Sequence, residues 1–150
     1  MSNHDNNAPV DVRGPRFAAW VTTAVLIGVL IVFAFSPLAA TVLLAAQAVV
    51  FAIGALNGPR RHPYGVVFAK LVAPGLSPVT EREPVAPLRF AQLVGLIFAV
   101  AGVAGFLATP VVGLTATALA LTAAFLNAAF GICLGCQLYP LVVQLRPTRA

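Results

Sequence analysis

Apolar residues gather in four long runs, which are separated by two short turns and one long polar connection. The runs cover about residues 17–35, 38–56, 88–108 and 111–131. Each is close to the length of about 20 residues that a helix needs to cross a hydrocarbon core roughly 30 Å thick. The pattern therefore predicts four membrane-spanning helices.

Two dipeptides separate neighbouring runs. Ser36-Pro37 lies between the first and second runs, and Thr109-Pro110 lies between the third and fourth. Proline is tolerated in the first turn of a helix, whereas the residue before it is pushed out of helical geometry. Both dipeptides therefore predict a tight turn between two antiparallel helices.

Polar sequence occupies the two ends of the chain and the long connection. Residues 1–16 are rich in Asn, Asp, Gly and Pro and predict a disordered tail, with a cleaved signal peptide as the alternative. A membrane domain of residues 17–145 follows, and residues 146–150 form a C-terminal tail. Within the connection, residues 57–87, the apolar residues at helical spacing between 64 and 72 predict a short amphipathic helix in the membrane interface.

The two halves of the chain resemble each other at a constant offset. Arg16-Phe17-Ala18 recurs 73 residues later as Arg89-Phe90-Ala91, and the first turn recurs at the same offset as the second. Each half starts and ends on the same side, so the halves are predicted to be parallel repeats about a pseudo-two-fold axis along the membrane normal. The predicted fold class is all-α, an integral membrane four-helix bundle made of two parallel-repeat helical hairpins.

The composition excludes an ordinary water-exposed surface. Hydrophobic residues make up 60% of the chain and charged residues only 9%, and the mean hydropathy is +0.96. Soluble domains carry about 25% charged residues. The lipid bilayer is therefore the first predicted partner of the chain.

All nine Lys and Arg residues fall on one side of the predicted bundle, and the two short turns carry none. On a soluble protein a net charge of +5 would suggest nucleic acid. Here the basic residues flank apolar runs, which indicates membrane topology and anionic lipid, and no nucleic-acid partner. The positive-inside rule then predicts that both termini, the long connection and the cysteines face the cytoplasm.

The only two cysteines, Cys133 and Cys136, form a Cys-x-x-Cys motif where the fourth run gives way to polar sequence. One interpretation is a catalytic redox or sulfur-carrying pair, because this spacing brings two sulfurs within bridging reach. A second is a metal site, which would need His62, His4 or the cysteine pair of another chain, since closed zinc sites have four ligands. The third is that both cysteines are small apolar packing residues.

A few polar residues lie within or near the apolar runs. Gln47, Gln92 and Asn127 are predicted to make helix–helix hydrogen bonds. The alternative for Gln47 is a transport site, and the alternative for Asn127 is a direct role beside the cysteines, which would need a kink at Gly131. None of the runs contains Asp or Glu, which argues against an ion-coupled transporter. Rows of Ala and Gly at four-residue spacing predict close helix packing.

Three segments together resemble a known family. VDVRGPRFAA near the start, PLRFAQLVGLIFA at the third run and FLNAAFGICLGCQLY near the end are similar to bacterial four-helix membrane proteins grouped as domain of unknown function 4395. The resemblance implies four spans and a bacterial inner (cell) membrane location, but no activity. Some members appear beside sulfurtransferase or thioredoxin-like proteins. The motif of the family places its cysteine pair at Cys133 and Cys136 and its asparagine at Asn127.

The leading functional hypothesis is a thiol-redox or sulfur-relay component that uses Cys133 and Cys136 with a soluble thioredoxin-like or sulfurtransferase partner. The alternatives are a structural membrane subunit with packing cysteines, or a metal-binding protein, for which a homo-oligomer would pool two cysteine pairs. The sequence predicts no cofactor and leaves open whether the protein is an enzyme.

Overall fold

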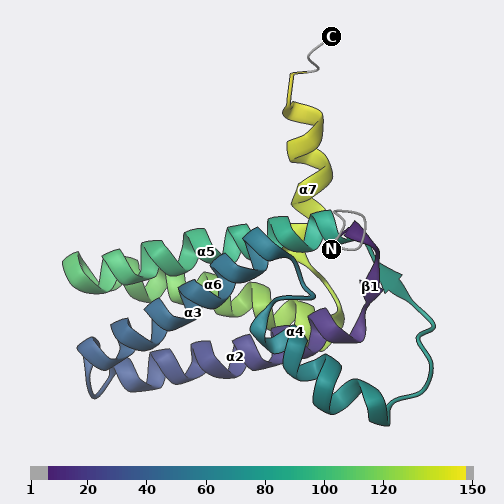
Figure 1. Cartoon of the computed structure of the whole chain (residues 1–150). Coiled ribbons are helices and arrows are strands. Elements are labelled where there is room, and N and C mark those ends of the chain that lie inside the picture. The colour runs from purple at the N-terminus through teal and green to yellow at the C-terminus, as the bar shows by residue number, and fades with distance from the viewer. Residues whose placement is uncertain (1–6, 148–150) are drawn as a thin grey trace.

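Four long helices lie side by side in the computed structural model, which describes residues 7–147 (Figure 1). They are α2 (Arg13–Phe33), α3 (Pro37–Asn57), α5 (Val85–Ala108) and α6 (Pro110–Phe130). Each is long and apolar enough to cross a membrane. The predicted all-α class with four membrane-spanning helices is therefore confirmed.

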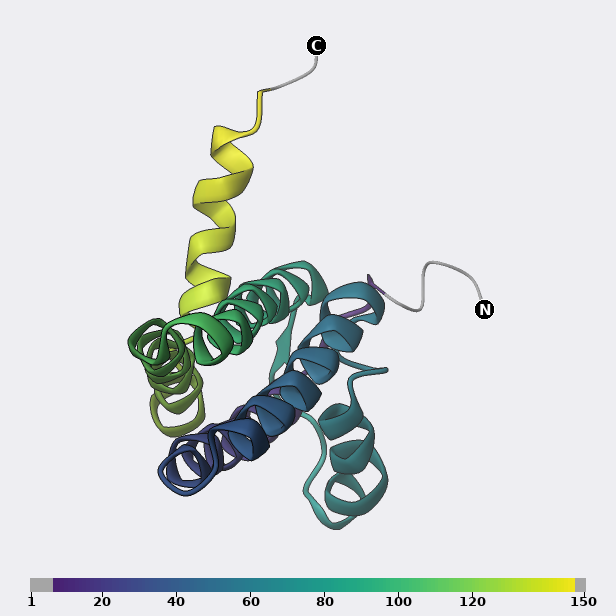
Figure 2. The same cartoon turned by 90° about the vertical axis from the view of Figure 1, so that its left-hand side faces the viewer.

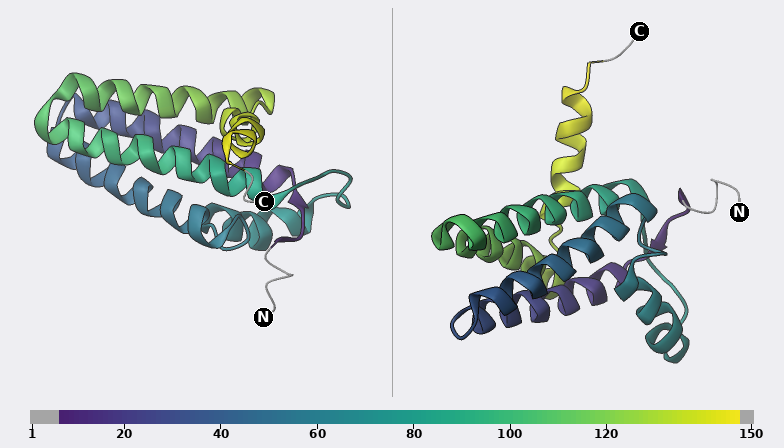
Figure 3. Two further views of the ribbon diagram at one scale, coloured as in Figure 1. Left: turned by 90° about the horizontal axis from the view of Figure 1, so that it is seen from above. Right: turned by 60° about the vertical axis from the view of Figure 1, so that its left-hand side comes forward.

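Short elements gather at the end of the bundle opposite the two turns (Figure 1). The strands β1 (Val10–Asp11) and β2 (Arg82–Glu83) pair antiparallel there. The long connection also contains a continuous helical segment formed by α4 (Pro63–Val67), the π-helix η1 (Phe68–Val72) and the 3-10 turn η2 (Ala73–Gly75). The last helix, α7 (Leu134–Leu145), leaves this end across the direction of the bundle (Figure 2). It is seen nearly end-on when the bundle is viewed from above (Figure 3).

The helix starts follow from the two X-Pro turns. Ser36 has extended backbone at the N-cap of α3, and its hydroxyl accepts a hydrogen bond from the N–H of Ala39 at 3.2 Å. Thr109 has nearly the same backbone angles at the N-cap of α6. Proline occupies the first helical position in both cases, where its missing N–H costs no helical hydrogen bond.

The 73-residue repeat is visible in the contacts as well as in the sequence. Phe33 and its repeat mate Phe106 stack on each other with ring centroids 4.7 Å apart. Arg16 donates to the carbonyl of Ala128 on α6, and its mate Arg89 donates to the carbonyl of Ala55 on α3, which is the mate of Ala128. Equivalent residues of the two halves thus make equivalent contacts, so that α2 packs on α6 as α5 packs on α3. This is the arrangement that a pseudo-two-fold axis requires.

The centre of the bundle is apolar and the outside remains apolar too. Buried residues such as Leu26, Val29 and Leu44 form the core, while Ile31, Ile97 and other large hydrophobic side chains are exposed. Only 22–33% of the most apolar window of each long helix is buried. A surface of this kind is stable against lipid chains and not against water.

Residues 7–16 differ from the predicted disordered tail. Val10 and Asp11 pair with Glu83 and Arg82, and α2 already begins at Arg13. The side chains of Arg13 and Asp11 form an ion pair at 2.7 Å, which lowers the pKa of Asp11. Local composition could not reveal this order because the pairing strand lies about seventy residues away. Residues 1–6 and 148–150, the remainder of the two predicted tails, lie outside the described residues.

Candidate redox site at the end of the fourth helix

The cysteine stretch begins where Gly131 ends α6. Gly131 has a left-handed backbone (φ 70°), and its N–H donates to the carbonyl of Asn127 at 3.0 Å. The N–H of Ile132 then donates to the carbonyl of Leu126 at 3.2 Å. Glycine adopts this backbone without the steric cost of a Cβ atom. The chain therefore leaves the helix axis here instead of continuing into α7.

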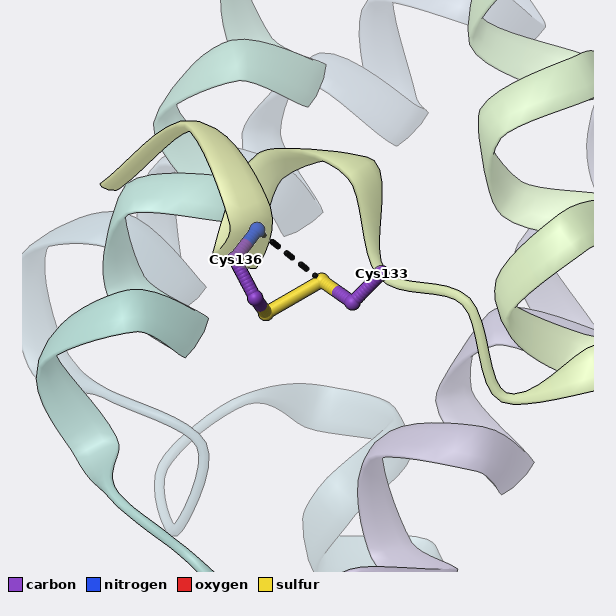
Figure 4. The surroundings of a disulfide bond; sticks show 2 residues. All are labelled: Cys133 and Cys136. Carbon is purple, nitrogen blue, oxygen red and sulfur yellow. Dashed lines mark hydrogen bonds between the residues drawn. A yellow bond between two sulfur atoms is a disulfide. The ribbon is translucent and has the colours of Figure 1, made fainter. Parts of the chain in front are cut away.

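Cys133 is the N-cap residue of α7, and Cys136 lies in the first turn of that helix (Figure 4). The two form a disulfide, with their Cα atoms 5.2 Å apart. The N–H of Cys136 also donates to Sγ of Cys133 at 3.2 Å, which is the dashed line in Figure 4. A helix N-terminus stabilises negative charge, so it favours the thiolate of Cys133 once the disulfide is reduced.

Gly135, between the two cysteines, allows this first turn to touch α5. A Cβ atom on Gly135 would lie 2.6 Å from Cα and 2.7 Å from Cβ of Ala91. About one turn further along α7, the ring of Tyr139 packs against the ring of Phe90, the residue before Ala91, with centroids 5.9 Å apart. The disulfide is therefore held against a membrane-spanning helix and does not hang on a free loop.

A cavity of about 320 Å³ lies beside the disulfide, between α2, α5, α6 and α7, and Phe51 of α3 also lines it. Its polar lining near the cysteines comes from Cys133, Asn127 and Gln92. Most of the remaining lining is apolar and includes Phe51, Phe98, Leu119 and several alanines. The structure therefore brings Cys133, Asn127 and Gln92, predicted as separate features, to one cavity.

The family profile described as "Domain of unknown function (DUF4395)" matches residues 10–144, which reach from β1 into α7 and include both cysteines. The chain belongs to this family. The resemblance seen in the sequence is thereby confirmed. No curated protein and no solved structure shows significant similarity to this DUF4395 protein.

A second polar group of the DUF4395 protein is buried at the same end of the bundle. His62, the N-cap residue of α4, is 2% exposed, and neither of its ring nitrogens has a hydrogen-bond partner among the described residues. Burial lowers the pKa of His62 to about 4, and the nearby Gln92 offsets part of this effect. Gly54 makes room for the ring, because a Cβ atom there would lie 2.6 Å from Cδ2 of His62.

Gln47 has the inter-helix hydrogen bond that the sequence predicted, although its partner lies on a short helix. The hydroxyl of Tyr64 on α4 donates to Oε1 of Gln47 on α3 at 2.6 Å. His62 and Gln92 line a cavity of about 470 Å³, together with Asp11, Arg60, Arg82 and apolar residues. Sequence reasoning named His62 only as a candidate metal ligand and missed its burial, for which the only local signal was a His between Arg61 and Pro63.

The metal interpretation gains no second ligand pair from residues 7–147. No group of three or more His, Cys, Asp or Glu side chains in this part of the chain could hold a metal ion. His62 lines a different cavity from Cys133, and His4 lies outside the described residues. The metal site stays a prediction that requires the cysteine pair of another chain.

Proposed function

We propose that this DUF4395 protein is a membrane thiol–disulfide oxidoreductase that exchanges electrons with a soluble thioredoxin-like or sulfurtransferase partner. The observation that carries the proposal is the Cys133–Cys136 disulfide at the N-terminus of α7. Thiol–disulfide exchange can break the bond between these two cysteines, and the helix N-terminus stabilises the thiolate of Cys133 that reduction produces.

The exchange consists of two thiolate attacks. A partner thiolate attacks Sγ of Cys133, forming a mixed disulfide while Cys136 leaves as a thiolate. The second partner thiol, once deprotonated, attacks the partner's sulfur in that mixed disulfide and releases Cys133 as a thiolate. Two protons from the partner dithiol end on the cysteine pair, so that the partner is oxidised by two electrons and the membrane protein is reduced by two.

A sulfur relay would use the same two residues. A partner persulfide transfers its outer sulfur to the thiolate of Cys133, and Cys136 then attacks Sγ of Cys133, forming the disulfide and releasing hydrosulfide. Both versions require at least one sulfur that a soluble protein can reach, and Cys133 and Cys136 are each only partly buried.

The distribution of basic residues supports a partner on the cytoplasmic side of the membrane. The described Lys and Arg residues lie in the first turn of α2, in the connection between α3 and α5, near the start of α5, or after α7, whereas the two turns carry none. The positive-inside rule supports a cytoplasmic position of this end in a bacterial inner membrane. Disulfides in that compartment are usually transient and catalytic, which favours a redox role over a structural one.

Thiol trapping in intact cells tests this function. Cells treated with oxidant or reductant are quenched with acid and labelled with a mass-shifting maleimide, with Cys133→Ser/Cys136→Ser as the control. We expect the two cysteines to move together between the unlabelled and labelled states. A Cys136→Ser variant should then trap a mixed disulfide between Cys133 and the partner. Thiols that react only after denaturation under every condition would show that the cysteines are packing residues.

A further inference from the structure

The proposed exchange leaves two electrons on the cysteine pair, and a catalytic cycle needs somewhere to pass them. Cys133 itself lines the 320 Å³ cavity that runs into the bundle. Any acceptor that reacts with the pair from within the membrane would occupy this cavity. Its shape and lining therefore indicate the chemical class of the acceptor.

The cavity changes in polarity along its length. Asn127 and Leu119 both line it and stand eight residues apart on α6, which corresponds to about 12 Å along a helix. The end near Cys133 has two carboxamides, from Asn127 and Gln92, and the inner end has Phe51, Phe98 and Leu119. Leu119 is 52% exposed on the outer face of the bundle, where lipid would contact it. The lining thus suits a molecule with a polar head beside the disulfide and an apolar tail directed toward the bilayer.

The polar end is neutral. Among the described residues that line the cavity, none is Asp, Glu, Lys, Arg or His. An anionic ligand such as thiosulfate or a phosphate would lack a counter-charge in this cavity. A carboxamide offers both donors and an acceptor. Oε1 of Gln92 is buried without a hydrogen-bond partner in the described chain, and the Gln92 side chain lies between this cavity and the one lined by His62. A buried acceptor of this kind favours a ligand that can supply a hydroxyl group.

From this geometry we infer that the cavity binds a membrane quinone, which reoxidises the Cys133–Cys136 dithiol. A quinone has an apolar ring that can pack against Phe51 and Phe98, carbonyl oxygens that accept from the carboxamides, and a lipid-soluble tail. Its reduced form carries hydroxyl groups that can donate to Oε1 of Gln92. The same side chains therefore match the ligand both before and after the reaction.

The redox step balances without a further reactant. The thiolate of Cys133 attacks the quinone ring, and Cys136 then attacks Sγ of Cys133, so that the disulfide forms as the bond from sulfur to the ring breaks. Two electrons pass to the ring, and the two thiol protons end on its oxygens as quinol. This inference rests on the proposed function, because it supplies the second half of that cycle.

The test uses the full-length protein, reduced and then freed of reductant, in detergent micelles without oxygen. Decylubiquinone is the probe, quinol formation is followed by ultraviolet absorbance, and disulfide formation is followed by maleimide mass shift. We expect one quinol for each disulfide formed, and no reaction with Cys133→Ser/Cys136→Ser. In parallel, exchange between the oxidised protein and reduced thioredoxin measures the proposed function separately.

Cavity variants locate the reaction. Ala124→Leu fills part of the cavity and should lower the rate of decylubiquinone reduction at least tenfold, while exchange with thioredoxin is retained. Ala118→Leu places the same side chain on an exposed position of α6 and should leave both reactions unchanged. Asn127→Leu should raise KM for decylubiquinone about five- to tenfold through a lost hydrogen bond, with a smaller effect on kcat.

Each outcome decides the inference. Exchange with thioredoxin but no reduction of decylubiquinone would refute the quinone site and leave the proposed function intact, whereas failure of both reactions would refute both. Wild-type quinone rates in Ala124→Leu and Asn127→Leu would place the reaction outside the cavity. If Ala124→Leu does not fold, an azido-quinone photolabel gives the answer. Labelling should map to residues 91–98 or 119–127, and labelling confined to other segments would overturn the site.

Discussion

Substituting Gly135 by alanine tests whether the first turn of α7 touches α5 as described. The added Cβ would lie 2.6 Å from Cα of Ala91, and ordinary contacts between such atoms begin at about 3.4 Å. The backbone of α7 must therefore move by close to 1 Å, since neither atom belongs to a flexible side chain. Overpacking of this kind typically costs about 1–3 kcal/mol.

A second effect of the same substitution has the opposite sign. Alanine is a better helix former than glycine by up to about 1 kcal/mol in a helix interior, and by less in the first turn. The free-energy cost of the clash is larger than this gain over most of the range of about 1–3 kcal/mol. We therefore expect Gly135→Ala to lower the free energy of unfolding by about 0.5–2.5 kcal/mol, the difference between these two effects.

Unfolding in mixed detergent micelles measures this change, with Gly75→Ala as the matched control because a Cβ on Gly75 would have nothing within 4 Å. The disulfide closes the first turn of α7 on itself, so its reduction lets the backbone of this turn relax and relieves part of the clash. The Gly135→Ala protein should therefore be easier to reduce, by up to about 30 mV for 1.4 kcal/mol. A variant as stable as the wild type, with an unchanged potential, would refute the contact between Gly135 and Ala91.

Three further changes test other parts of the structure. Arg89→Ala removes two hydrogen bonds, of 3.0 and 2.8 Å, to the last carbonyls of α3 and should cost about 1–2 kcal/mol in micelle unfolding, whereas exposed Arg61→Ala should cost little. Burial lowers the pKa of His62 in the folded protein to about 4, against an ordinary value of 6.5. As the pH falls from 6.5 to 4, the unfolded chain therefore binds a proton on His62 before the folded chain does. The free energy of unfolding should fall over this range by up to about 1.4 kcal/mol for each pH unit. This loss should vanish in His62→Asn, and an equal pH slope in both proteins would contradict the buried position. A double-mutant cycle of Phe33→Leu and Phe106→Leu should give a coupling of about 0.5–1.5 kcal/mol, and additivity would show that the rings do not stack.

Span length, turn chemistry and repeat spacing predicted the bundle because each is a local or periodic property of the sequence. About 20 apolar residues can bury their backbone polar groups only as a helix in lipid, so tertiary contacts are not needed to identify the four spans. The Ser36-Pro37 and Thr109-Pro110 turns are likewise fixed by the geometry of proline. The sequence therefore predicted the membrane part of the fold closely.

The site itself depended on contacts that no local pattern reveals. A glycine such as Gly131 signals that a helix can end, but the direction of α7 follows from the contact of Gly135 with Ala91 on another helix. The burial of His62 depends on a missing side chain at Gly54. The cavity depends on five helices at once. Sequence reasoning named Cys133, Asn127 and Gln92 individually but had no means to place them together.

The pseudo-two-fold axis also has a consequence for the evolution of the chain and for its assembly from fragments. Gly58 and Gly131 lie 73 residues apart at equivalent positions of the repeat. Both have a positive φ at the end of a long helix, and each is followed by a short helix. A tandem duplication of one ancestral hairpin gene would leave this arrangement, with His62 at the N-cap of one short helix and Cys133 at the other. Two separately expressed fragments, cut in the 76–81 segment between the hairpins, should accordingly still find each other in the membrane.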